Sequence, residues 1–293
     1  MTSPFITTSE LSDALNGPAV PAVLDASLVL HPAAFDGDYR LESARETWLE
    51  SRIPGSVYVD VSKEFSDTSA PFHYTHPEPQ AIINRLAHLG VAEGRAVVIY
   101  DTTGTMWAAR LWYLLRWVGV EARVLDGGLR EWIARGGAVT AGEPPRITPV
   151  PTWKAQVRRD FWVSQQELVE RSVADDRPLV CGLPARSFAG TDPTRYSRRG
   201  HIPGSVNVSS RDLFDKDGTV KSRVALVLAY NAAGVAVAEN SPEVLLYCGG
   251  GISAAANALT LAAIGVRAVR IYDGSLEEWS LNPDLPLEIT PEQ

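Results

Sequence analysis

The chain has 293 residues, enough for one large domain or two ordinary ones, and we favour two. A formal net charge of −8 disfavours nucleic acid and anionic membranes as main partners. We expect a soluble protein, because no apolar run could span a bilayer and the N-terminus lacks the features of a secretory signal. Two cysteines without zinc-site spacing favour a reducing, cytoplasmic setting and predict no metal.

Strand-forming runs alternate with helical ones along the chain. Aliphatic and β-branched runs bounded by turn residues predict strands at 22–24, 97–100, 123–125, 179–180, 244–247 and 269–272. Helices are predicted at 80–89, 106–118 and 254–264. This alternation predicts an α/β fold, a mostly parallel sheet with helices on both faces. Ligands then bind beyond the carboxyl ends of the strands, which points to Asp101 and Cys248.

Three sequence blocks occur twice, in the same order and at a nearly constant offset. The earlier copies at 52–59, 97–101 and 125–132 recur at 201–208, 244–248 and 272–279. The first and third pairs share Ile-Pro-Gly-Ser-Val and Asp-Gly respectively. This repetition predicts two copies of one domain, which we place at 1–142 and 158–293. Residues 143–157 include a proline-rich stretch and are predicted to form an extended linker.

The loop after the strand at 244–247 carries the strongest chemical signal. It reads Cys-Gly-Gly-Gly-Ile-Ser-Ala from Cys248 onward. Glycines permit a tight turn whose N–H groups converge, and the following helix adds its positive end. A sulfur at the centre would be stabilised as the thiolate, its nucleophilic form. We therefore predict Cys248 as nucleophile, with an anion cradle formed by Gly249, Gly250, Gly251, Ile252, Ser253 and Ala254.

This loop has three alternative interpretations. Cys248 could be a buried structural cysteine, although plain packing does not call for three glycines. The glycine pattern with Asp273 matches a dinucleotide-binding fingerprint, but it lies late in its domain, and the matching Asp126 follows a loop without that fingerprint. A cysteine phosphatase or arsenate reductase needs an arginine six residues after the cysteine, where this chain has Ala254.

With these motifs the chain resembles the tandem-domain rhodanese family of thiosulfate and 3-mercaptopyruvate sulfurtransferases, over about residues 6–287. The most specific matches are 200–207, the Cys248 loop, and 272–279 with the tail 283–286. The resemblance implies two rhodanese-like domains, the first catalytically inactive because Asp101 stands at the cysteine position. It also implies that Cys248 takes sulfane sulfur as a persulfide and passes it to cyanide or a thiol, without a cofactor. A thioredoxin-like reductant is a further expected partner.

The resemblance leaves the donor open between thiosulfate and 3-mercaptopyruvate. The Cys248 loop is closer to that of the mercaptopyruvate enzymes, whereas the thiosulfate enzymes have a basic loop. Of the serine–histidine–aspartate relay described for the mercaptopyruvate enzymes, this chain keeps the histidine as His73 but has Gly250 and Ser62 at the other two positions. A non-enzymatic persulfide carrier or sulfur sensor using the same cysteine stays open, as does a pure interaction module.

The donor's charged group is expected to bind arginines of the second domain. We predict Arg186 and Arg199 for this role, with Arg198 as a further candidate. Cys181 has no assigned role, and nothing in the sequence places it within disulfide reach of Cys248. An aromatic set at helical spacing is expected in the core or the domain interface: Trp107, Trp112, Tyr113 and Trp117.

Overall fold

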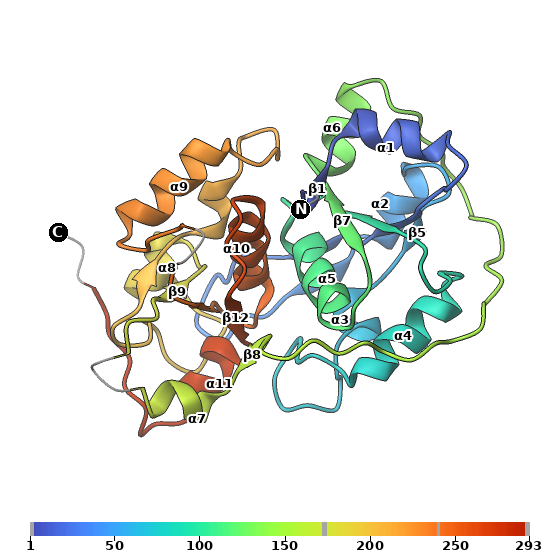
Figure 1. Ribbon diagram of the computed structural model, residues 1–293. Helices are drawn as coiled ribbons and strands as arrows, with labels where there is room; N and C mark the ends of the chain where they lie inside the picture. The colour runs from blue at the N-terminus through green and yellow to red at the C-terminus, as the bar shows by residue number, and fades with distance from the viewer. Residues whose placement is uncertain (1–2, 172–174, 239–240, 291–293) are drawn as a thin grey trace.

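The computed structural model describes residues 3–171, 175–238 and 241–290 and contains two five-stranded parallel sheets (Figure 1). In sheet order, the first is β1 (Phe5–Ile6), β7 (Ala122–Leu125), β6 (Val97–Tyr100), β2 (Ala22–Asp25) and β5 (Val57–Tyr58). The second is β8 (Trp162–Val163), β12 (Val269–Tyr272), β11 (Val244–Tyr247), β9 (Leu179–Cys181) and β10 (Val206–Asn207). The second sheet thus repeats the topology of the first, and the predicted strands are confirmed to within one residue at each end.

Helices surround both sheets. The first domain has α1 (Thr8–Leu15), α2 (Arg45–Glu50), α3 (Val61–Glu64), α4 (Pro79–His88), α5 (Met106–Trp117) and α6 (Gly128–Ala134). It also has an antiparallel hairpin, β3 (Leu28–Leu30) with β4 (Leu41–Ser43). The second domain has α7 (Gln165–Val169), α8 (Ala185–Ala189), the 3-10 helix η1 (Ser210–Leu213), α9 (Arg223–Ala232), α10 (Ile252–Ala263) and α11 (Ser275–Leu281).

The two domains meet where α5 packs against α10, in the middle of the molecule (Figure 1). One continuous cluster of buried apolar side chains runs through both domains. The Tyr113 hydroxyl crosses the interface and donates to the carbonyl of Phe161 at 2.6 Å. The aromatic set predicted for the core or interface is buried throughout: Trp107, Trp112, Tyr113 and Trp117.

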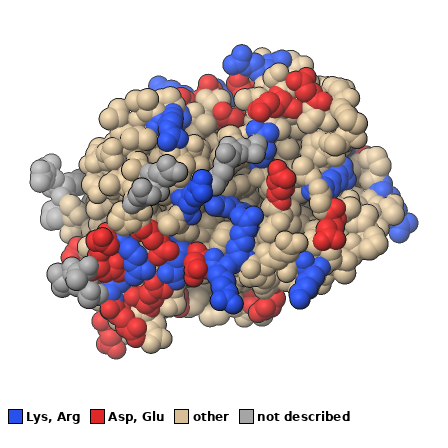
Figure 2. Space-filling model, in the orientation of Figure 1, with Lys and Arg blue, Asp and Glu red and all other residues tan. Residues whose placement is uncertain are grey.

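Residues 141–158 form neither helix nor strand and run along the first domain before entering β8. Their backbone is tied down at Val150, which donates to Ala87, and at Gln156, which donates to Val118. On the face in Figure 2, acidic and basic side chains are interspersed, and a group gathers near α7. There Glu167 pairs with Arg177 and Arg270. No helix in the described part of the chain is long and apolar enough to cross a bilayer.

Candidate active site

The strand that leads to Cys248 is held by the Ile-Pro-Gly-Ser turn of its own domain. Tyr247 ends β11 and is fully buried. Its hydroxyl accepts the Ile202 N–H at 3.1 Å and lies 2.7 Å from the Ser205 hydroxyl. The first domain repeats these contacts around Tyr100. In both domains the repeated motif therefore fixes the end of the strand, and with it the position of the following residue, Cys248 or Asp101.

The first turn of α11 holds the Cys248 loop from the other side. The Cys248 N–H donates to the Ser275 hydroxyl oxygen at 3.1 Å. The N–H groups of Leu276 and Glu277 donate to the carbonyls of Cys248 and Gly249 at 3.1 and 3.0 Å. The second copy of the Asp-Gly motif thus positions the cysteine.

Close packing, as well as turn geometry, requires the loop glycines. A Cβ on Gly249 would lie 1.5 Å from the Tyr196 hydroxyl oxygen. Gly251 has φ +79°, a left-handed conformation that favours glycine, and a Cβ there would come within 2.9 Å of Arg110 Nη1. The twelve-residue α10 begins at Ile252, directly after Gly251. Its first N–H groups have no partner within the helix, and its positive end faces the loop.

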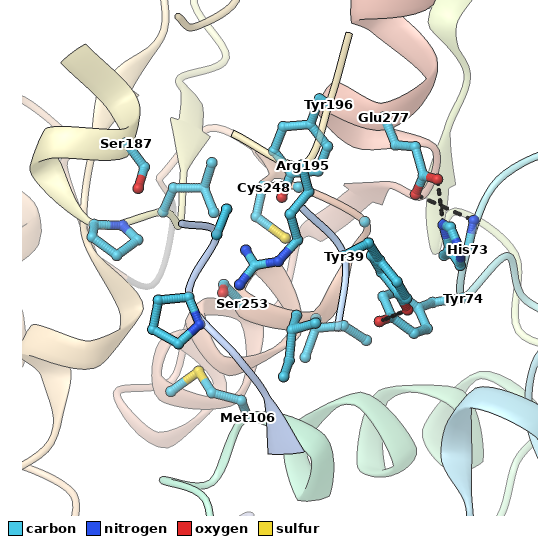
Figure 3. Close-up of a pocket in the computed structure, with 18 of the residues that line it drawn as sticks. Tyr39, His73, Tyr74, Met106, Ser187, Arg195, Tyr196, Cys248, Ser253 and Glu277 are labelled. Carbon is cyan, nitrogen blue, oxygen red and sulfur yellow. Dashed lines mark hydrogen bonds and ion pairs between the residues drawn. The ribbon is translucent and has the colours of Figure 1, made fainter. Parts of the chain in front are cut away.

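Cys248 faces a cavity of about 870 Å³ between the two domains (Figure 3). Four other loop residues line it: Gly249, Gly250, Ile252 and Ser253. Gly251 and Ala254 are buried and do not belong to the described lining. Cys248 is 2% exposed and lines the cavity, so a reagent reaches its sulfur through this space.

Arg195 extends its guanidinium into the cavity beside Cys248 (Figure 3). One nitrogen donates to the His31 carbonyl in the first domain, while the buried Nε has no hydrogen-bond partner among the described residues. The β3–β4 hairpin holds the segment through Gly37, whose N–H donates to the Thr194 carbonyl at 2.8 Å. The sequence analysis missed Arg195 and predicted Arg198 and Arg199 from the same stretch of chain, because only the hairpin contacts decide which arginine turns inward.

The three arginines predicted for the donor lie elsewhere and make other contacts. The Arg186 side chain is 65% exposed and pairs with Asp192 at 2.7 Å. Arg199 pairs with Asp36 of the first domain at 2.9 Å. Arg198 donates to three backbone carbonyls at and beyond the end of α11, at 2.7 to 3.0 Å. None of the three is among the described residues that line the cavity.

His73 lies in the cavity wall, where it is paired with a carboxylate from the other domain (Figure 3). Its Nδ1 is 2.5 Å from Glu277 Oε1, and its ring stacks on Tyr39 with centroids 4.2 Å apart. In the neutral imidazole, a carboxylate at Nδ1 favours the tautomer protonated there, in which Nε2 is an acceptor. Sequence reasoning missed Glu277 because its partner is 204 residues away. Gly250 lines the cavity, but Ser62 of α3 donates to Asp60, the residue before that helix, and does not belong to the described lining.

A buried ion pair joins the first domain to the turn between β12 and α11, next to Gly251 of the Cys248 loop. Arg110 of α5 is fully buried, and its Nη2 lies 2.7 Å from Asp273 Oδ1. The same nitrogen donates to the Tyr74 carbonyl at 2.5 Å. The His76 N–H donates to the other Asp273 oxygen at 2.7 Å. One Asp273 oxygen is thus paired with a buried arginine and the other accepts a backbone N–H, which further disfavours a ribose-binding role for Asp273.

The residues related to Cys248 by position or chemistry, Asp101 and Cys181, are also buried, and neither is among the described residues that line the cavity. Asp101 accepts the N–H groups of Thr103, Thr105 and Ala108 at 2.8 to 2.9 Å, yet burial raises the pKa of its carboxyl. Cys181 ends β9, and burial raises the pKa of its thiol to about 12. Both cysteines are free. Within the described ranges, no group of three or more His, Cys, Asp or Glu side chains could hold a metal ion.

The rhodanese-like domain model matches the chain twice, over residues 7–135 and 185–282. The chain belongs to the rhodanese family.

This rhodanese is 28% identical over 292 residues to 3-mercaptopyruvate sulfurtransferase of Escherichia coli K12, covering 97% of each chain. It is 30% identical over 242 residues to thiosulfate sulfurtransferase of Bos taurus, covering 80% of each. The crystal structure of SseA, a 3-mercaptopyruvate sulfotransferase from Escherichia coli, matches with a TM-score of 0.77 at 26% identity, covering 94% of this chain and 99% of that one. The predicted fold of two rhodanese-like domains is confirmed.

Proposed function

We propose that this chain is a sulfurtransferase that moves sulfane sulfur through a persulfide on Cys248. The observation that carries the proposal is the position of Cys248, on the cavity wall at the N-terminal end of α10. In the first step, the Cys248 thiolate attacks the sulfane sulfur of a donor, and the donor's bond to that sulfur breaks. In the second, cyanide or a thiol attacks the outer sulfur and Cys248 leaves as thiolate. The loop N–H groups and the helix end stabilise the anion in both steps.

For the donor, we propose 3-mercaptopyruvate over thiosulfate. Arg195 and Arg211 line the cavity, but Asp192 and Glu277 line it as well, so their formal charges cancel. A donor with one carboxylate matches the Arg195 guanidinium, whereas a dianion requires more positive charge. Ser187, also in the wall, stands where the family resemblance places an arginine. With 3-mercaptopyruvate the carbon–sulfur bond breaks, and pyruvate leaves as its enolate, which then takes a proton.

The first domain, within the boundaries 1–142 given above, has a supporting role in this proposal. Asp101 occupies the position of the nucleophile, and a carboxylate cannot accept sulfane sulfur. The domain nevertheless supplies His73, and its hairpin holds the Arg195 segment of the catalytic domain, 158–293. A thioredoxin-like reductant would be one thiol acceptor, which fits a reducing compartment and two free cysteines.

Mass spectrometry of the intact protein tests the proposal directly. Exposure to 3-mercaptopyruvate should add the mass of one sulfur atom to the wild type and to Cys181→Ser, and nothing to Cys248→Ser. Steady-state turnover with cyanide should be higher with 3-mercaptopyruvate than with thiosulfate. Sulfur on a residue other than Cys248 would refute the mechanism. A persulfide that forms but turns over only slowly with either donor would instead favour the carrier or sensor.

A further inference from the structure

The cavity at Cys248 is much larger than the small molecules that the sulfur-transfer cycle requires. Its volume of about 870 Å³ lies in the upper part of the range for drug-sized ligands, about 300 to 1,000 Å³. Cyanide, thiosulfate and 3-mercaptopyruvate have only a few non-hydrogen atoms each, and one water molecule occupies about 30 Å³ of liquid. Any of these reactants would leave most of the space to solvent. The size therefore suggests a larger second substrate.

Much of the cavity wall is apolar and aromatic. The strand β3 contributes Leu28, Val29 and Leu30 from the first domain, and Trp107 is part of the wall as well. The ring of Tyr74, also in the wall, meets Trp107 edge-on with centroids 5.2 Å apart. Apolar surface of this kind gains free energy when an apolar group covers it, about 25 cal/mol for each Å² removed from water.

The guanidinium of Arg195 fixes the orientation of a negatively charged ligand in the cavity. The Arg195 guanidinium extends into the cavity beside Cys248, and its buried Nε lacks a hydrogen-bond partner among the described residues. A carboxylate bound there would place an attached thiol near the cysteine (Figure 3). Because donor and acceptor react in separate steps, the same guanidinium can serve both.

We propose that the acceptor is an organic thiol with one carboxylate and an apolar, aromatic body, an inference that rests on the proposed function. Its carboxylate binds Arg195, and its body lies against the β3 wall. The acceptor thiolate attacks the outer sulfur of the Cys248 persulfide. A new sulfur–sulfur bond forms on the acceptor while the old one breaks, and Cys248 leaves as thiolate. The product is the acceptor's persulfide, and no oxidant or reductant is consumed.

Matched thiols test this preference. Protein carrying the Cys248 persulfide is mixed with N-acetylcysteine, N-benzoylcysteine or N-benzoylcysteinamide, and loss of the persulfide is followed by rapid quenching. N-benzoylcysteine should react with a second-order rate constant at least about tenfold above that of N-acetylcysteine, because a hydrophobic pocket rewards the added carbons. The amide, which lacks the carboxylate, should lose about tenfold relative to N-benzoylcysteine. Equal rates for the acetyl and benzoyl thiols would overturn the proposal.

Variants locate the effect in the cavity. Val29→Trp fills space at the β3 wall and should reduce the benzoyl-to-acetyl rate ratio, and Ala33→Trp is a second variant of the same wall. Val224→Trp is the matched control, because Val224 is 69% exposed on α9 and lies outside the described lining. A ratio unchanged in both wall variants would overturn the assignment.

Binding of the same thiols to Cys248→Ser, measured by calorimetry, reports the preference without any persulfide. Tighter binding of the benzoyl thiol would support the acceptor class even if no persulfide forms, which would refute only the proposed function. Equal binding would refute the acceptor class. The proposed acceptor class would also be contradicted if the Cys248 persulfide passed its sulfur quickly to a thiol protein but equally slowly to all three small thiols.

Discussion

The loops that follow β6 and β11 occupy the same place in two copies of one fold, yet they hold their anions differently. In both, a clamped tyrosine ends the strand and a left-handed residue precedes the helix, Thr105 with φ 72° and Gly251 with φ 79°. After β6, the Asp101 carboxylate itself accepts the converging N–H groups. After β11, the shorter Cys248 side chain faces the cavity, where a substrate's sulfur can lie beside it. The comparison shows how a single side chain can fill such a cradle or leave it open for chemistry.

The neighbouring strands extend the contrast. Asp25 ends β2 beside β6, and Cys181 ends β9 beside β11, each paired in register with the tyrosine before the loop. Both groups are buried, and burial raises the pKa of Asp25 to about 6 and that of Cys181 to about 12. The first domain thus holds two carboxylates where the second holds two thiols, and only Cys248 lines the large cavity.

Moving the nucleophile between the loops should give the largest effect. In Asp101→Cys combined with Cys248→Ser, the thiol would sit outside the lining of the large cavity, at a position whose backbone is packed against Gly128. We expect no persulfide after exposure to 3-mercaptopyruvate, and slower alkylation than at Cys248, because the donor site of the large cavity does not reach this loop. The measurement is iodoacetamide alkylation followed by mass spectrometry. Persulfide formation at residue 101 would show that the loop, and not the cavity around it, is sufficient.

Removing the inward arginine should have the next largest effect. Arg195→Met is expected to lower kcat/KM for 3-mercaptopyruvate by about 10- to 100-fold, because the variant loses the charged hydrogen bond between the guanidinium and the donor's carboxylate. Arg186→Met is the matched control in the same domain, and it should stay within about threefold because Arg186 lies outside the described cavity lining. An equal loss of kcat/KM in the two variants would contradict the role of Arg195 and would favour the donor-binding arginines predicted from the sequence.

The buried carboxyl of Asp25 predicts a smaller, pH-dependent effect on stability. Because its pKa is raised from 3.8 to about 6, the folded state binds the proton more tightly than the unfolded state. The tighter proton binding adds on the order of 3 kcal/mol to the free energy of unfolding. This contribution is present in full below about pH 4 and is lost as the pH rises through about 6. Asp25→Asn lacks the titration. Urea unfolding of both proteins at about pH 4 and about pH 7 should therefore show wild type losing stability relative to the variant.

A pH-independent difference between the two proteins would mean that Asp25 has an ordinary pKa in the folded state. Burial is the main cause of the expected rise in the pKa, and the charge of Asp101 acts in the same direction. The same comparison with Cys181→Ser should show no such change below neutral pH, because its thiol stays protonated there.

The sequence by itself determined the repeated fold and the nucleophile candidate, because those signals are local. Periodicity and turn residues predict strands and helices, and a cysteine followed by glycines predicts an anion cradle from adjacent residues alone. Only the tertiary structure decided which charged groups surround that cysteine. Arg195 turns inward because a hairpin more than 150 residues earlier binds its backbone segment, and Glu277 meets His73 across the domain interface. Such contacts depend on how two domains pack, and no short-range pattern encodes that.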